Sequence, residues 1–407
     1  MAVNTVDEIL LLIFDAVSGP VCLEWPDSKY DHERARAPFV LASVCRQWRL
    51  LAQSTSTLWT YFGLPFESGS HGVHLARLTT LVPLVKSASI DVLFGCDEPN
   101  LSSDTMQILG QITSLLSQWR SAQFEMPLEE QSGMFSHKPV HTAPILQQLS
   151  ITSIDRVLHL PQAPQLVRAY VNCKNIAVPD PLSHFPKVSS WCSCVYYRVS
   201  AQRFGTAYAA QLVELCIGEY LWLEETLDMP CLLTLALFDP SFLKFIRAPK
   251  LCNLALDVDQ LLQENQEENQ AHTVPYFSNA LVPLAGVSTI TFTVPALLQK
   301  VREYRQPSYE IHSGFFTRLT DTQQPVWPSL NRIELAPGCG HFEHGELLAF
   351  VESRNLLVGK GIEESHTSMI KNVTIGAQEF CNPPTWFFTR LKAVLRPIGQ
   401  ALTPDIV

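Results

Sequence analysis

The chain has 407 residues, of which 46% are hydrophobic and 17% are charged, and its formal net charge is -10. This acidic balance argues against a nucleic-acid or anionic-membrane surface, because both require clustered Lys and Arg. The apolar content is ample for a buried core and excludes a largely disordered chain. The first apolar run, Ile9 to Phe14, follows two acidic residues and is too short for a secretory signal or a membrane span.

The cysteine content and the length of the chain indicate its compartment and its domain organisation. The eleven cysteines include no C-x-x-C pair, and several lie within apolar patterns, which indicates a reducing compartment. We therefore expect an intracellular protein, cytoplasmic or nuclear. The length exceeds a single typical core, whereas repeat architectures reach it without splitting. We expect one small domain followed by one extended repeat domain.

The first expected helix covers Asp7 to Phe14, with acidic residues in its first turn, where they suit the helix dipole. A second helical pattern follows after a charged segment, Asp15 to Pro38, in which Pro20, Pro26 and Pro38 are expected to act as breakers. Its apolar residues fall at helical spacing and place Arg46 and Arg49 on the solvent side. The apolar set is Val40, Leu41, Val44, Cys45, Trp48 and Leu51. An ordinary buried helical hairpin would show the same stripe.

The order of an acidic apolar helix, Val44-Cys45-Arg46-Gln47-Trp48 and then Leu58-Trp59 resembles the F-box. The resemblance implies a small helical module, residues 1–63, that docks on a Skp-family adaptor and carries a substrate-binding domain into a cullin-RING ubiquitin ligase. Trp48 and Trp59 are the expected anchors, since aromatic residues dominate interface energetics. The expected docking and packing residues are Ile9, Leu10, Ile13, Val44, Cys45, Trp48, Leu58 and Trp59. Val6 and Ser56 replace prolines common in the family, which keeps open a module that no longer engages the ligase.

Beyond this region, a segment of the form Pro-x-Leu-x-x-Leu-x-Leu recurs at the spacing of leucine-rich repeats. The segments are 144–151, 164–171, 186–193, 210–217, 230–237, 249–256, 285–292 and 328–335. The expected fold class is α/β: the helical module, a linker and cap over 64–142, and a leucine-rich-repeat-like solenoid over 143–407 with a curved parallel sheet. Ile154 and Lys174 stand where the regular family has asparagine, so the repeat is degenerate. The whole chain resembles F-box proteins with degenerate repeats, of the type common in basidiomycete fungi.

Alternation along each Leu-x-Leu strand should send the leucines into the core and the residues between them onto an exposed sheet. The resemblance implies that this sheet binds a protein substrate, although a purely solvated sheet fits equally well. The expected substrate-facing residues are Arg168, Tyr170, Glu214, Asn253, Thr291, Arg332 and Glu334. A protein-binding repeat scaffold that does not engage the ligase is the alternative function.

Other segments complete the organisation. Ala88 to Phe94 and Ser121 to Met126 are expected as strands of the N-terminal cap, and 259–270 as a short helix that fades into a polar loop. Glu343 to Ser353, Asn372 to Ile375 and Thr385 to Leu395 are expected as a helix, a final strand and a closing helix.

No catalytic or cofactor motif stands out, and we expect an adaptor with no cofactor and no enzymatic activity. Cys339, His341, Glu343 and His344 place four potential ligands within six residues, but zinc sites usually draw ligands from two separated pairs. The Cys192-Ser193-Cys194 segment lacks the two-residue spacing of redox pairs. Nucleophile-elbow, phosphate-loop and dinucleotide fingerprints are absent from the sequence.

Overall fold

The computed structural model describes residues 5–18, 30–66, 71–96, 102–126, 142–153, 157–172, 175–177, 185–193, 208–217, 226–237, 243, 245–256, 286–292, 316, 320, 327–335, 343–359, 368–375 and 384–395. The chain is mixed α/β and divides into two units, Met1–Tyr208 and Ala209–Val407. The boundaries expected at residues 63 and 142 both fall inside the first unit.

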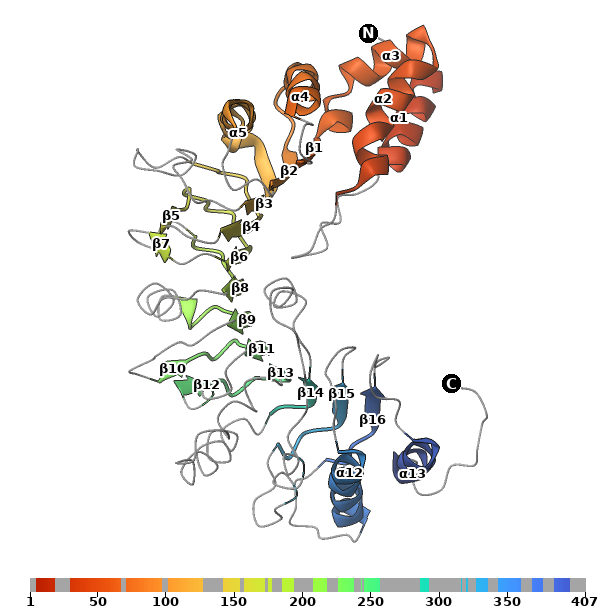
Figure 1. Ribbon diagram of the computed structural model, residues 1–407, viewed down its shortest axis with the longest axis vertical. Coiled ribbons are helices and arrows are strands. Elements are labelled where there is room, and N and C mark those ends of the chain that lie inside the picture. The colour runs from red at the N-terminus through yellow and green to blue at the C-terminus, as the bar shows by residue number, and fades with distance from the viewer. Residues whose placement is uncertain are drawn as a thin grey trace. The chain divides into compact units, whose positions relative to one another are not determined.

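The first unit begins with three helices and continues into a parallel sheet (Figure 1). The helices are α1 (Thr5–Ser18), α2 (His32–Val44) and α3 (Arg46–Ser54), followed by the 3-10 turn η1 (Ser56–Trp59). The next elements are β1 (Tyr61–Phe66), α4 (His71–Val85), β2 (Ile90–Cys96), α5 (Ser103–Ser114), η2 (Leu116–Gln118) and β3 (Trp119–Met126). The strands β4 (Gln148–Ser153), β6 (Arg168–Asn172) and β8 (Ser190–Ser193) extend the sheet, while β5 (Val157–His159) and β7 (Asn175–Ala177) pair separately.

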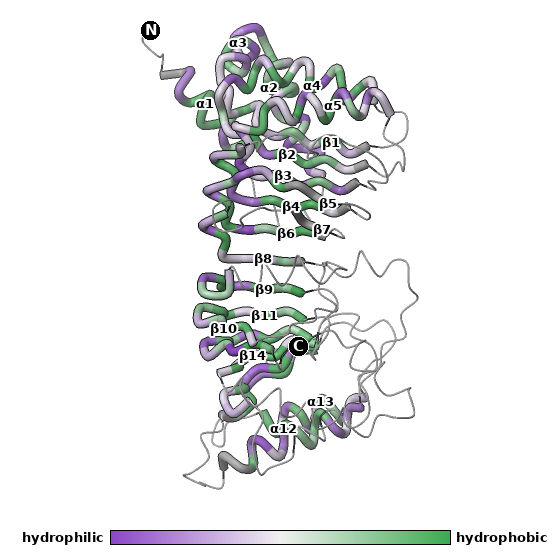
Figure 2. The backbone as a smooth tube through the Cα atoms, turned by 90° about the vertical axis from the view of Figure 1, so that its left-hand side faces the viewer, coloured by the Kyte–Doolittle hydropathy of each residue, from purple (hydrophilic) through white to green (hydrophobic). Residues whose placement is uncertain are grey.

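The strands of this sheet follow the order β1-β2-β3-β4-β6-β8, and each adjacent pair is parallel. Figure 2 shows them stacked one after another, with α4 and α5 beside the first strands. One face carries large apolar residues in register, such as Phe94 beside Phe124 and Ile151, and all three are buried. Leu78, Ile108 and other apolar residues of α4 and α5 are buried as well. Burial of apolar surface on this face is the main force that orders the unit.

The second unit repeats the strand pattern with shorter strands. Its main sheet follows the order β9 (Glu214–Ile217), β11 (Thr234–Leu237), β13 (Asn253–Leu256), β14 (Thr289–Phe292), β15 (Arg332–Leu335) and β16 (Asn372–Ile375), all parallel. A small ladder joins β10 (Leu227–Asp228) to β12 (Ile246–Arg247). The helices α12 (His344–Gly359) and α13 (Thr385–Leu395) pack against each other at the C-terminal end of the unit.

A tight turn precedes most of the repeat strands. In the turn before β4, the amide of Leu146 donates to the carbonyl of Ala143, the residue before Pro144, over 3.2 Å. Equivalent bonds close the turns at Pro164, Pro186, Pro230, Pro249 and Pro328. Proline suits the second position of such a turn because its ring fixes φ. The residue before each proline is buried in every case, so each turn packs a side chain into the core just before the strand.

The strand predictions are confirmed and several helix predictions need correction. All eight predicted repeat segments end in a parallel strand, and Asn372–Ile375 and Thr385–Leu395 have the expected structure. The helical pattern expected from Val40 to Leu51 is interrupted: Cys45 is extended, with φ -156° and ψ 174°, and separates α2 from α3. Pro38 does not break a helix, because it lies buried inside α2. The expected helix over 259–270 and the breakers Pro20 and Pro26 lie outside the described residues.

Candidate functional site

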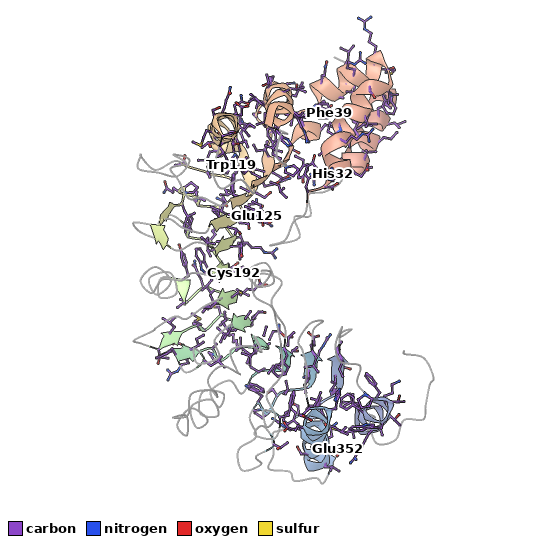
Figure 3. The ribbon with its side chains drawn as sticks, in the orientation of Figure 1. His32, Phe39, Trp119, Glu125, Cys192 and Glu352 are labelled. Atoms are coloured by element: carbon purple, nitrogen blue, oxygen red, sulfur yellow. The ribbon has the colours of Figure 1, made fainter. Side chains whose placement is uncertain are left out.

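The three N-terminal helices with η1 form a helical module whose interior is aromatic. Trp59 is buried, donates its indole Nε1–H to the carbonyl of Ala52 over 2.7 Å, and meets the ring of Phe39 edge to face at 5.3 Å between centroids. Figure 3 shows Phe39 on the side of α2 that faces the first strands. Leu10 and Phe14 anchor α1 and are both buried. The interior of the module is therefore complete without any partner.

A second set of apolar side chains on the same helices is exposed. We call this set the apolar face of the module: Ile9, Leu12, Ile13 and Val17 on α1, Val40 and Val44 on α2, and Leu50 on α3, with exposed fractions between 41% and 71%. On α1, Ile9, Ile13 and Val17 recur every fourth residue, so they follow one stripe of the helix. This stripe is distinct from Leu10 and Phe14, which point into the module. The helical module thus presents apolar surface that its own interior does not use.

The structure divides the eight residues expected to dock or pack. Ile9, Ile13, Val44 and Cys45 are exposed. Leu10, Leu58 and Trp59 are buried, and a rigid docking partner could not reach the Trp59 ring. Trp48 lies between these sets: it is half-buried, and its ring meets that of Phe14 at 5.3 Å in an edge-to-face contact. Of the two expected aromatic anchors, only Trp48 retains accessible surface.

The break at Cys45 directs α3 into the module. The Cys45 thiol accepts a hydrogen bond from the amide of Trp48 over 3.5 Å and so caps the first turn of α3. The side-chain amide of Gln47 donates through Nε2 to the Asp7 carboxylate over 3.0 Å, which joins α3 to α1. Arg46 and Arg49 are exposed, as expected from the spacing. These local contacts hold α1 and α3 side by side without covering the apolar face.

The sheet face of the first unit is polar but closely packed. The register places Gln123, Ser150, Tyr170 and Cys192 in one row across four strands, and all four are buried. The expectation that Tyr170 is an accessible binding residue is therefore wrong, because only 5% of it is exposed. Residues that are adjacent in the row lie on paired strands, about 4.8 Å apart. Arg168 is exposed, one row away.

The sheet face of the second unit is more open. Glu214, Asn253 and Arg332 are exposed in one row of the register, as expected. In the next row Thr291 donates to Glu334 over 3.0 Å, and Glu334 pairs with Arg332 at 2.6 Å. This row also holds Cys216, Ala236 and Ala255, all half-buried. The sheet therefore offers charged and amide groups beside a shallow row of small residues.

The metal and redox segments gain no support from the described residues. Within the described ranges, no group of three or more His, Cys, Asp or Glu is placed to hold a metal ion. Cys339 and His341 lie outside these ranges, while His344 is the first residue of α12 and its ring lies 5.2 Å from that of Phe387. Cys194 also lies outside them. Cys45, Cys192, Cys216, Cys231 and Cys252 take part in no disulfide. In the same ranges, no helix has the length and apolar content needed to cross a membrane.

Two features of the module and its junction with the sheet were missed from the sequence. Leu12, Val17 and Leu50 are among the exposed apolar residues, and the period of α1 could have shown that its apolar residues occupy more than one stripe. The buried carboxylate of Asp91 on β2 bonds to Arg120 and Ser121 and lies close to Arg34. Its neighbours in the sequence, Ile90 and Val92, give no sign of a charged contact.

The sequence matches no protein-family model, and no curated protein matches it.

Proposed function

We propose that this protein is the substrate-recognition subunit of a Skp-cullin-F-box ubiquitin ligase. In this proposal the helical module docks a Skp-family adaptor through its apolar face, and the parallel sheet binds a protein substrate. The protein itself performs no chemistry and acts by bringing a substrate to the ligase.

The apolar face of the module is the observation that carries the proposal. Seven aliphatic side chains on three adjacent helices remain exposed although the interior of the module is complete. Burial of one such side chain stabilises a complex by about 1.5–3 kcal/mol before the costs of association. Scattered exposed leucines are common, whereas apolar groups gathered on one small module are typical of a protein-binding surface. The order of sequence motifs that resembles the F-box supports an adaptor as the partner.

The substrate half of the proposal rests on the open sheet of the second unit. Glu214, Asn253 and Arg332 offer an acidic, an amide and a basic group from alternate strands of the sheet, β9, β13 and β15. Parallel strands hold these groups on a rigid backbone, which favours recognition of a protein surface over a small molecule. Charged groups in an exposed row of this kind contribute chiefly to the specificity and the rate of association with a partner.

Co-expression with a Skp-family adaptor and pull-down test the docking half. The native chain should retain the adaptor, and Val44→Asp should weaken binding at least tenfold, because docking would bury an unpaired carboxylate. Val73→Asp is the matched control: Val73 is 70% exposed on α4, outside the module, and its substitution should leave binding unchanged. A folded native chain that retains no adaptor would refute the ligase proposal and leave a repeat scaffold as the remaining function. Equal loss from both variants would show that the apolar face is not the docking surface.

A further inference from the structure

The carboxylate of Asp91 is enclosed where the helical module meets the sheet of the first unit. Its side chain is 1% exposed. The Arg120 Nε–H donates to Oδ1 over 3.1 Å, its Nη2 contacts Oδ2, and the Ser121 hydroxyl also donates to Oδ1. A register shift between Ile90 and Asp91 places Trp119 opposite the first and Ser121 opposite the second, with Arg120 between them. The β3 strand thus supplies two partners to one buried charge.

The third partner comes from the helical module. Nη2 of Arg34, in the first turn of α2, lies 4.0 Å from Asp91 Oδ2, and the Arg34 side chain is only 11% exposed. Burial lowers the pKa of Arg34, while the charge of Asp91 acts in the opposite direction. The guanidinium also lies over the Tyr61 ring, 5.2 Å from its centroid. The cation of Arg34 is therefore held in a poorly solvated place by the negative charge of Asp91.

Uncharged contacts join the same two parts. The Tyr61 hydroxyl accepts the Asp31 amide over 3.0 Å. Arg77 on α4 donates to the Tyr30 hydroxyl over 2.9 Å and to the carbonyls of Gly63 and Ala35 over 3.2 and 3.0 Å. Figure 3 shows His32, the first residue of α2, close to the first strands. The centroid of its ring lies 4.3 Å from that of Tyr30. These contacts position α2, but they do not neutralise Arg34.

We infer that Asp91 is a charge latch that attaches α2 to the sheet, so that loss of its negative charge releases residues 30–44 while the rest of the protein stays folded. Without Asp91 the guanidinium of Arg34 keeps only the weaker attraction of the Asp31 charge in a poorly solvated place. Separation of the start of α2 from β1 and β2 would return this cation to water. Arg120 is 39% exposed and can turn to water instead. The latch therefore acts mainly through Arg34. The inference concerns the free protein and does not depend on any adaptor.

Hydrogen exchange followed by mass spectrometry on the full chain tests the latch, since exchange rates report local opening. In Asp91→Asn, amides of residues 30–44 should exchange at least 100-fold faster, while those of β11 and β13 keep native rates. In the double variant Arg34→Met with Asp91→Asn, the amides of residues 30–44 should exchange at least tenfold more slowly than in Asp91→Asn alone, because the buried cation is absent. Glu352→Gln is the matched control: Glu352 pairs with Arg390 in an exposed contact of the second unit, and its loss should leave residues 30–44 unchanged.

Three outcomes would overturn the inference. Native exchange of residues 30–44 in Asp91→Asn would show that the charge is not needed. Equal loss of protection in α2 and in β2–β4 would show a general packing role. A double variant no better than the single one would show that Arg34 is not the stranded charge. Should Asp91→Asn fail to fold, Arg34→Met alone still decides: it should loosen residues 30–44 about tenfold and spare β3, and native protection of α2 in that variant would refute the latch.

Discussion

Substitution of Trp59 should destabilise the free helical module even when no partner is present. The ring is 2% exposed, packs edge to face on Phe39, and donates a hydrogen bond to the Ala52 carbonyl. Truncation of a buried Trp to Ala costs about 3–5 kcal/mol, and loss of a hydrogen bond contributes about 1 kcal/mol within that range. The Thr55 amide also donates to the Ala52 carbonyl, so this carbonyl keeps a partner. We expect a loss of about 4 kcal/mol in the module for Trp59→Ala.

Trp48→Ala supplies the comparison, because Trp48 is half-buried and its ring meets that of Phe14 edge to face. Its cost should be about 1–2 kcal/mol. Hydrogen exchange across residues 46–66 measures both costs locally, which avoids treating a two-unit chain as a two-state folder. About 4 kcal/mol corresponds to roughly a thousandfold faster exchange for Trp59→Ala. A loss below about 1 kcal/mol would refute the placement of Trp59 in the interior and return it to the candidate docking residues.

Three further predictions concern particular contacts. A Cβ on Gly63 would lie 2.5 Å from a ring carbon of Tyr30, so Gly63→Ala should cost about 1–3 kcal/mol, measured by hydrogen exchange in β1 and β2. Gly95 has open space around it, so Gly95→Ala should cost at most about 1 kcal/mol, and an equal cost for both variants would contradict the prediction. Asn355 bonds the amide and carbonyl of Ile370 and a carbonyl of α13, so Asn355→Ala should cost about 2–4 kcal/mol and speed exchange in α13; native exchange there would contradict this. Burial lowers the pKa of Arg354 from its ordinary value to about 10. Above pH 10 the unfolded chain therefore binds more protons than the folded one, and stability rises with pH. In thermal unfolding at pH 9 to 11, the unfolding temperature of the native chain should rise relative to that of Arg354→Met only above pH 10. A difference in unfolding temperature that does not change with pH would contradict the lowered pKa.

The repeat strands could be predicted because their signal is local. In segments such as Leu235 and Leu237 of β11, alternation and an upstream proline define both the strand and its buried face. The strand β1 was missed because Gly63 and Pro65 interrupt its pattern, and it is ordered by pairing with β2 and by the rings around Gly63. Its existence depends on the fold more than on propensity.

The candidate site was predictable only in part, for a similar reason. Helical spacing identifies α1 as apolar, but it cannot tell which of two apolar stripes faces the interior. The sequence therefore does not distinguish Leu10, which is buried, from Ile9, which is exposed. The Asp91–Arg34 contact joins residues far apart in the sequence, and no periodic pattern encodes it. The burial of Tyr170 follows from neighbours on β4 and β8, which a single strand does not reveal.

Because of the proline turns, the register of the sheet does not depend on the length of the chain that connects two strands. Each such turn closes on itself within four residues, and the strand that follows starts at a point set by that turn. Thr234 pairs with Asn253, which follows the Pro249 turn, and Thr289 pairs with Arg332, which follows the Pro328 turn. The second connection is much longer than the first, yet both join strands in the same alignment. Insertions can therefore accumulate between strands without shifting the exposed rows of the sheet. Such a protein can acquire new connecting segments during evolution while its sheet face changes only by substitution, one position at a time.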